Sequence, residues 1–267
     1  MARPDARKPV GTAPAGSQTL LQTTALTKEF SGFTAVNAVD LAVREGTIHA
    51  LVGPNGAGKT TLFNLLSGFL HPTSGTINYA GTDITGKPPE QIAHLGVARS
   101  FQITSLFDQM SLREHVELAL ASPTGMGRQW WSPSRKLAVF APRAMELLEQ
   151  VGLAPQAAVL AGALPYGQKR ALELAIALAL EPRLLLLDEP TAGMGIEDID
   201  RTIALVKQIA AGRTVVFVDH NMHVVGSLAD TVTVLQAGKI LAEGPYDQVR
   251  NDERVVTAYL GSADVGH

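Results

Sequence analysis

Short apolar runs recur along the chain and predict the strands of a buried sheet. Thr47–Val52, Leu184–Leu187 and Thr214–Val218 are almost entirely apolar, which is typical of strands covered on both faces in a parallel sheet. Thr19–Thr24 predicts a further strand, and alternation from Ala35 to Val43 predicts a half-buried one. These runs are separated by helical patterns, so the fold class is α/β.

Glycine-containing turns predict two hairpins and the end of another strand. Gly75–Tyr79 with the following Gly81–Asp83 turn predicts an edge hairpin, and Gly238 lies between two short strand patterns, 231–235 and 239–243. Gly96–Gln102 predicts a strand that ends on Gln102.

Helical spacing and capping residues predict the helices. Apolar residues recur at helical spacing after Thr61, and Ser111 with Glu114 forms a capping box. The further helices are expected at 112–120, 144–151, 169–180 and, as one or two polar helices, 246–260. Ser122–Pro142 is irregular and carries Trp130 and Trp131. We expect a separate helical lobe here, whose tryptophans either pack the lobe, which we favour, or face a partner or lipid headgroups.

Composition narrows the classes of function. The net charge is −3, the isoelectric point is about 6.2 and there is no cysteine. The chain therefore lacks the excess of positive charge that is typical of nucleic-acid-binding proteins. Without cysteine, disulfides, cysteine nucleophiles and thiolate metal sites are excluded. No run of about 18 apolar residues and no signal-peptide pattern occurs, so we expect a soluble chain whose membrane role comes through a partner. Residues 1–18, rich in Ala, Pro, Gly and Arg, predict a disordered tail.

A glycine-rich loop between a predicted strand and a predicted helix carries the strongest chemical signal. Its residues are Gly53, Pro54, Asn55, Gly56, Ala57, Gly58, Lys59, Thr60 and Thr61. Glycines let backbone N–H groups surround a phosphate, and the helix N-terminus adds positive partial charge. The lysine can bridge β- and γ-phosphates, and the Thr60 hydroxyl can bind Mg²⁺. The sequence therefore predicts a nucleotide-binding P-loop.

Polar residues at the ends of other predicted strands complete this site. Asp188 and Glu189 follow the leucine strand, where an aspartate can hold Mg²⁺ and a glutamate can polarise water. Gln102 and His220 also end strands. A glutamine in that place can touch Mg²⁺ or water, although alone it is usually an exposed glutamine. A lone histidine there is usually structural, but His220 is the third polar strand tip in the series, which favours a γ-phosphate role. Phe30 either stacks on adenine or is an ordinary core or turn residue.

The order of these motifs resembles the ATP-binding cassette (ABC) family over about residues 20–261. The resemblance rests on five motifs in this order: the P-loop, Gln102, Leu164–Gln168, Leu184–Pro190 and His220. The stretches Arg99–Gln102, Asp188–Gly193 and Val255–Gly261 resemble the ATPase subunits of branched-chain amino acid importers, most closely the larger of their two ATPase types.

The resemblance implies a P-loop NTPase (RecA-like) core with an antiparallel β subdomain and an inserted helical subdomain. The ATPase domain would span 19–264, with 19–100 and 165–264 as the core and β subdomain and 101–164 as the helical subdomain. It implies that ATP is bound with Mg²⁺, and that Phe30 stacks on adenine. Thr60, Gln102 and Asp188 would serve Mg²⁺, Glu189 would be the general base, and His220 would sense the γ-phosphate. The signature motif would be Leu164, Pro165, Tyr166, Gly167 and Gln168.

The implied partners are transmembrane permease subunits, a second like or unlike ATPase subunit and, indirectly, a periplasmic binding protein, with no nucleic acid. The chain would sit peripherally on the cytoplasmic face of the inner membrane. The cargo would be branched-chain amino acids or related small amides or urea. A lipid-type exporter ATPase and a non-transport ABC ATPase are the alternatives.

The chain departs from the family pattern at two places. The common signature has Ser, Gly and Gly after its first leucine, where this chain has Pro165, Tyr166 and Gly167, and Pro165 offers neither hydroxyl nor N–H. Gly195 stands near the usual position of an aspartate, which weakens the expected coupling across a dimer.

Overall fold

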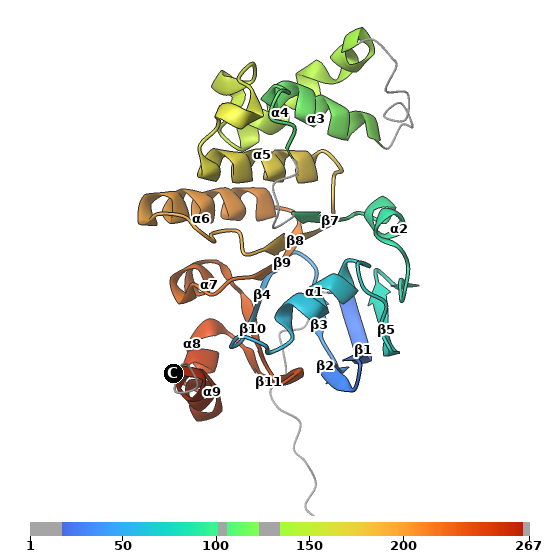
Figure 1. The fold of residues 1–267 in the computed structure, drawn as a ribbon, viewed down its shortest axis with the longest axis vertical. Helices are drawn as coiled ribbons and strands as arrows, with labels where there is room; N and C mark the ends of the chain where they lie inside the picture. Colours follow the sequence, from blue (N-terminus) through green and yellow to red (C-terminus); the bar gives the residue numbers. More distant parts are fainter. Residues whose placement is uncertain (1–17, 101–105, 123–133, 264–267) are drawn as a thin grey trace, which may run out of the picture.

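The computed structural model describes residues 18–100, 106–122 and 134–263, and Figure 1 shows their arrangement. Gln102, Trp130, Trp131 and nearly all of the predicted tail, 1–18, lie outside these ranges.

A six-stranded sheet forms the centre of the molecule. Its order is β11 (Lys239–Gly244), β10 (Thr231–Gln236), β4 (Ile48–Val52), β9 (Thr214–Val218), β8 (Leu184–Asp188) and β7 (Val97–Ser100). All neighbours pair in parallel except β11, which is antiparallel to β10. The carboxyl ends of β4, β9, β8 and β7 therefore meet at one edge of the sheet.

A second, antiparallel sheet forms from the first third of the chain. It contains β2 (Phe33–Val39), β1 (Thr19–Phe30), β5 (Ser74–Tyr79) and β6 (Thr82–Asp83), and β3 (Ala42–Arg44) also pairs with β1. The prediction of one strand over 35–43 was wrong, because the chain breaks between β2 and β3. At this break Asp40 Oδ1 accepts from the Ala25 N–H, and the buried Thr23 hydroxyl donates to the Val39 carbonyl and accepts from the Leu41 N–H.

The helices agree with the sequence pattern where capping or spacing is strong. The helical elements are α1 (Lys59–Leu66), α2 (Pro89–His94), α3 (Leu112–Ala121), η3 (Ser134–Phe140), α4 (Ala141–Gln150), η4 (Ala154–Gln156), η5 (Ala161–Ala163), α5 (Tyr166–Leu178), α6 (Ile196–Ala210), α7 (Met222–Leu228), α8 (Tyr246–Arg250) and α9 (Glu253–Ala263). The capping box of Ser111 and Glu114 is confirmed at the start of α3.

Some helix boundaries differ from the prediction, and three helices were not predicted. Helix α4 starts before the predicted 144, because Pro142 lies in its first turn, where no N–H is needed. Helix α5 starts at Tyr166 rather than 169, with Pro165 as its N-cap. The helices without a prediction are α2, α6 and α7.

The central sheet is covered on both faces. On one face Leu185, Leu187 and Phe217 pack in a core with residues of α3 to α7. On the other face Leu186 and Val216 pack with α1, α2 and the antiparallel sheet. Figure 1 shows α5 and α6 stacked on one side of the sheet and α1 with the antiparallel strands on the other. Helices α1 and α5 therefore lie on opposite faces.

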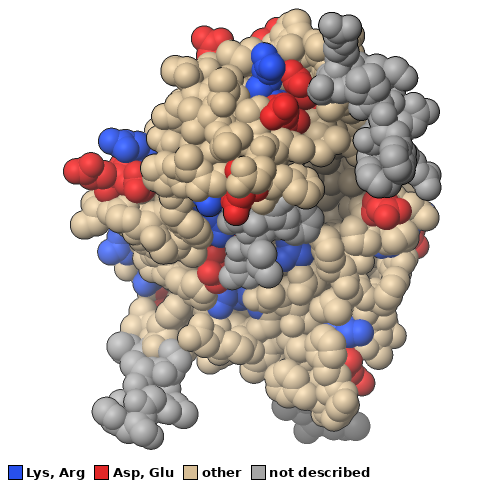
Figure 2. Space-filling model, turned by 45° about the horizontal axis from the view of Figure 1, so that its top comes forward, with Lys and Arg blue, Asp and Glu red and all other residues tan. Residues whose placement is uncertain are grey.

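Surface charge is mixed on the face shown in Figure 2, where Lys and Arg alternate with Asp and Glu. Within the described ranges, none of the helices has the length and apolar content needed to span a membrane.

Candidate functional site

Three neighbouring strands deliver the candidate residues to one edge of the sheet. Strand β4 leads into the glycine loop, β8 ends at Asp188, and β9 is followed by Asp219 and His220. Val218 on β9 lies in register with both Leu51 on β4 and Asp188 on β8. The loop, the carboxylates and the histidine therefore share one edge, as expected at the carboxyl ends of parallel strands.

Two loop glycines are required by close backbone approaches. A Cβ on Gly53 would lie 2.2 Å from the Leu235 carbonyl oxygen, and one on Gly58 would lie 2.3 Å from the Ala35 carbonyl oxygen. Gly58 also has φ +99°, in the left-handed region that favours glycine. Larger residues at either position would push the loop off its support.

The turn between β10 and β11 supports the glycine loop from outside it. The Gly238 N–H donates to the Ala57 carbonyl at 3.0 Å, and the Gly238 carbonyl accepts from the Asn37 N–H at 2.8 Å. The sequence predicted a hairpin at Gly238 but did not connect it with the P-loop.

Lys59 is buried inside the loop that precedes it. Its ammonium donates to the carbonyls of Gly53 at 2.6 Å and Pro54 at 3.0 Å. Burial lowers the pKa of the Lys59 ammonium from its usual value, and the Glu189 carboxylate opposes this. The cation is therefore held among the loop carbonyls. Thr60, next along α1, is exposed.

Glu189 and His220 form a pair at the tips of β8 and β9. His220 Nε2 lies 2.7 Å from Glu189 Oε1, and the Glu189 N–H donates to the Val218 carbonyl at 2.9 Å. Glu189 has φ +47°, an uncommon conformation for a residue with a side chain. The structure thus brings together the predicted base and the predicted phosphate-sensing histidine.

Asp188 lies beside them and is almost fully buried. Its Oδ2 accepts from Arg99 Nη2 at 2.7 Å. Arg99 was not predicted as a site residue, because its partner Asp188 is 89 residues away along the chain. The pairing of β7 with β8, with Arg99 opposite Leu186, brings the two side chains together.

A short buried link joins the loop after Glu189 to β9. Thr191 Oγ1 donates to Asp219 Oδ2 at 2.6 Å, and both residues are buried. Neither was predicted as a site residue, and the pair has no local sequence signal because the partners are distant along the chain.

The predicted signature residues lie at the start of α5. Leu164 is buried and Tyr166 is exposed; the Tyr166 hydroxyl accepts from Arg170 Nη2 at 3.0 Å. Gly167 faces α6, where a Cβ would lie 3.5 Å from Asp198 Cγ.

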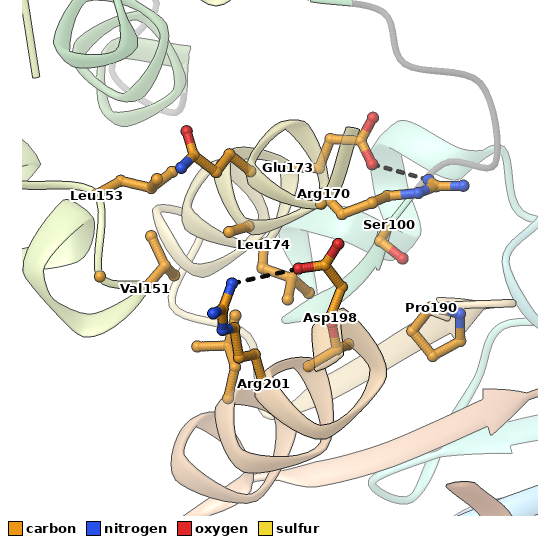
Figure 3. A pocket seen from close by; sticks show the side chains of 15 residues that line it. Ser100, Val151, Leu153, Arg170, Glu173, Leu174, Pro190, Asp198 and Arg201 are labelled. Atoms are coloured by element: carbon orange, nitrogen blue, oxygen red, sulfur yellow. Dashed lines mark hydrogen bonds and ion pairs between the residues drawn. The ribbon is translucent and has the colours of Figure 1, made fainter. Parts of the chain in front are cut away.

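A cavity of about 290 Å³, lined in part by Gly167 and Gln168, opens beside this motif. Figure 3 shows its apolar wall of Val151, Leu153 and Leu174, and the ion pairs Arg170–Glu173 at 2.9 Å and Arg201–Asp198 at 3.4 Å. The signature is therefore next to a hollow between α5 and α6.

Phe30 ends β1 and is 42% exposed, with Lys28 Nζ 5.0 Å from the ring centroid. The ring is thus only partly covered by the protein.

The oxygen donors present fit a magnesium ion better than a transition metal. Asp188 offers a carboxylate and Thr60 a hydroxyl, and Mg²⁺ is commonly bound by one or two carboxylates together with phosphate oxygens. No group of three or more His, Cys, Asp or Glu suited to hold a metal occurs among the described residues.

Comparisons with known proteins agree with this architecture. The ABC transporter family profile matches residues 36–192, and that of the branched-chain amino acid ATP-binding cassette transporter matches residues 239–265. The branched-chain amino acid transport ATP-binding protein BraF of Pseudomonas aeruginosa is 39% identical over 256 residues, covering 92% of this chain and 100% of BraF. LivG of Salmonella typhimurium is 38% identical over 256 residues with the same coverages.

A solved relative has the same fold. The ADP conformation of MJ1267, an ATP-binding cassette of an ABC transporter, superposes with a TM-score of 0.83 at 29% identity, covering 91% of this chain and 99% of that one. The expected fold class, a P-loop ATPase with an antiparallel β subdomain and helical regions, is thus confirmed. From its motifs, its fold and these similarities, the chain belongs to the ATP-hydrolysing ATP-binding proteins of ABC transporters, within the branched-chain amino acid transporter type.

Proposed function

We propose that this chain powers the import of branched-chain amino acids or related small amides or urea, with Mg²⁺, as one of two ATPase subunits beneath a membrane permease. The catalytic part of the proposal rests on the Glu189–His220 contact at 2.7 Å. The histidine follows β9, which pairs with the P-loop strand β4, and the glutamate follows β8, the next strand beyond β9. The cargo assignment is supported by the relatives, which are named as branched-chain amino acid transport proteins.

In this proposal the loop and Lys59 bind the phosphates of ATP. The ammonium would exchange the Gly53 and Pro54 carbonyls for phosphate oxygens, because a negatively charged oxygen attracts the cation more strongly than a neutral carbonyl does. Phe30 would stack on adenine. Thr60, Asp188 and Gln102 would hold Mg²⁺, which when bound neutralises charge on the β- and γ-phosphate oxygens.

Glu189 is proposed as the general base that takes a proton from the attacking water. The His220 Nε2–H donates to Glu189 Oε1, and His220 is proposed to orient that carboxylate and to sense the γ-phosphate. General-base catalysis contributes about 10²–10⁴-fold to rate.

The signature residues, 164–168, are proposed to act on the ATP of a second ATPase subunit. This is supported by the packing, because α5 and α1 lie on opposite faces of the central sheet. With Pro165 lacking a donor, the Gly167 N–H, the Gln168 side chain and the helix start are the groups left to contact phosphate.

We further propose the division into a core with β subdomain, 19–100 and 165–264, and a helical subdomain, 101–164. The helical subdomain and the region of Gln102 would contact the permease on the cytoplasmic face of the membrane. Co-purification of permease subunits and a second ATPase with the tagged chain from membranes tests this, and a partner-free homodimer stimulated by nucleic acid would contradict it.

The catalytic assignment is tested by Glu189→Gln. This variant is expected to bind ATP with unchanged affinity and to hydrolyse it about 10²–10⁴ times more slowly, measured by phosphate release and by binding of a fluorescent ATP analogue. Glu181→Gln is a matched control, since Glu181 also has φ +47° but is exposed on the turn before β8. Normal hydrolysis by Glu189→Gln would remove Glu189 from the role of base.

A further inference from the structure

The Arg99 side chain connects Asp188, at the end of β8, with helix α1. Its Nη2 donates to Asp188 Oδ2 at 2.7 Å, while its Nη1 donates to Asn64 Oδ1 at 2.6 Å and to Ser67 Oγ at 2.9 Å. Asn64 lies on α1, the helix that follows the P-loop, and Ser67 is its C-cap. The side chains of Arg99 and Asp188 are only 11% and 3% exposed.

Two aromatic rings hold the guanidinium in place. The Arg99 guanidinium carbon lies 5.0 Å from the Phe63 ring centroid and 5.3 Å from that of Phe69. A planar guanidinium can stack on rings while it donates in several directions, which a lysine ammonium cannot do in the same way. The position of Arg99 is therefore set by the packing of α1.

The ion pair with Arg99 offsets the unfavourable electrostatics of the buried Asp188 carboxylate. A buried carboxylate without a partner is costly, because its lost hydration is not replaced. Asp188 also lies at the same sheet edge as the P-loop, where ATP adds several negative charges. A fixed cation beside Asp188 offsets part of the desolvation cost and reduces the repulsion.

We propose that Arg99 is a positioning residue that serves as the counter-ion of Asp188, so that the site accepts ATP before Mg²⁺ is present. This rests on the proposed assignment of Asp188 to the Mg²⁺ site. Mg²⁺ held by Asp188 would supply positive charge there, so Arg99 would then matter less for ATP affinity. Loss of Arg99 should consequently make ATP binding more dependent on Mg²⁺.

The test compares the ATP affinity of the full chain in EDTA with that in excess Mg²⁺, using a fluorescent ATP analogue. Arg99→Met is expected to weaken binding in EDTA about tenfold or more, which corresponds to about 1.4 kcal/mol, and binding in Mg²⁺ by less than about threefold. If Arg99→Met leaves the ratio of the ATP affinity in Mg²⁺ to that in EDTA unchanged, the proposal is overturned.

Two control variants separate charge from packing. Asn64→Ala removes one contact of Arg99 with α1 but keeps the Asp188 pair, so the ratio of the two affinities should stay as in the parent protein. Arg183→Met breaks an exposed ion pair with Glu45, 2.6 Å long, and should also leave the ratio unchanged. A rise of the ratio in Asn64→Ala as large as in Arg99→Met would assign the effect to helix packing and overturn the proposal.

Neutralising Asp188 provides a rescue experiment. With Asp188→Asn there is no carboxylate to compensate, so Arg99→Met/Asp188→Asn should bind metal-free ATP as well as Asp188→Asn alone. If Arg99→Met does not fold, the folded double variant decides the question in the same assay. A double variant that remains unfolded, or binds metal-free ATP about tenfold more weakly than Asp188→Asn, would refute the counter-ion role.

The same variants distinguish the two assignments. Asp188→Asn by itself should lose the increase in ATP affinity that Mg²⁺ gives the parent protein. If that increase persists, the assignment of Asp188 to Mg²⁺ fails, whereas the metal-free result for Arg99→Met still reports on the counter-ion role.

Discussion

The support of the P-loop by the β10–β11 turn can be tested with a single methyl group at Gly238. Gly238 has φ +76°, and a Cβ there would lie 2.9 Å from the Ala35 carbonyl oxygen and 3.1 Å from the Ala35 carbonyl carbon. The same carbonyl oxygen is 2.3 Å from the Cβ position of Gly58. Gly238→Ala must therefore displace main chain on which the P-loop rests.

The magnitude follows from two separate effects. Placing an L side chain in the left-handed region costs about 1–2 kcal/mol, and overpacking against backbone costs about 1–3 kcal/mol more. We therefore expect Gly238→Ala to lower the free energy of unfolding by about 2–5 kcal/mol. If about 1 kcal/mol of this strain falls on the loop in the ATP-binding state, ATP affinity drops about fivefold.

Gly212 provides the matched control. It has φ +75°, and a Cβ there would meet nothing within 4 Å. Gly212→Ala should therefore bear only the backbone term, about 1–2 kcal/mol, and should bind ATP like the parent protein. Urea unfolding and binding of a fluorescent ATP analogue measure both quantities. Equal destabilisation of the two variants with unchanged ATP affinity would refute the reasoning.

Two further predictions concern buried polar groups. Thr23→Val should lower the free energy of unfolding by about 2–4 kcal/mol, because the Val39 carbonyl and the Leu41 N–H lose their hydrogen-bond partner at the break between β2 and β3. Urea unfolding measures this, with Thr23→Ser as a control that keeps the hydroxyl. A loss below about 1 kcal/mol would contradict the prediction. Burial, followed by the charge of Arg44, lowers the pKa of His49 to about 4, so the unfolded state binds the proton first and stability falls as pH drops from about 6.5 to 4. Between pH 7 and 5 the titration of His49 lowers the free energy of unfolding by about 2 kcal/mol. Over this range the stability of His49→Gln should fall by that much less than the stability of the parent protein. An unchanged dependence of stability on pH would exclude His49 as its source.

The nucleotide-binding elements were predictable because their signals are local. The strand before Gly53, the loop and the start of α1 follow one another directly, and Leu184–Asp188 is an uninterrupted apolar strand. Helix α6, which was not predicted, also has a local signal, since Ile203, Val206 and Ile209 recur at helical spacing on its buried side.

The wrong predictions of strand and helix boundaries have a different origin. The break between β2 and β3 depends on the Thr23 hydroxyl, which bonds Val39, 16 residues further along the chain. Alternation alone cannot reveal such a bond, so 35–43 looked like one strand. Helix α5 likewise starts three residues before the predicted 169, with Pro165 as a residue at its N-cap that makes no side-chain capping bond.

By itself, the sequence determined which residue types follow each buried strand, because a strand, its turn and the next helix are specified by neighbours along the chain. Only the tertiary structure decided which strand ends lie next to one another. Arg99 and Asp188 are 89 residues apart, and Glu189 and His220 are 31 apart. Their meeting follows from the parallel pairing of β7, β8 and β9, because hydrogen bonds between strands fix the register that no local pattern encodes.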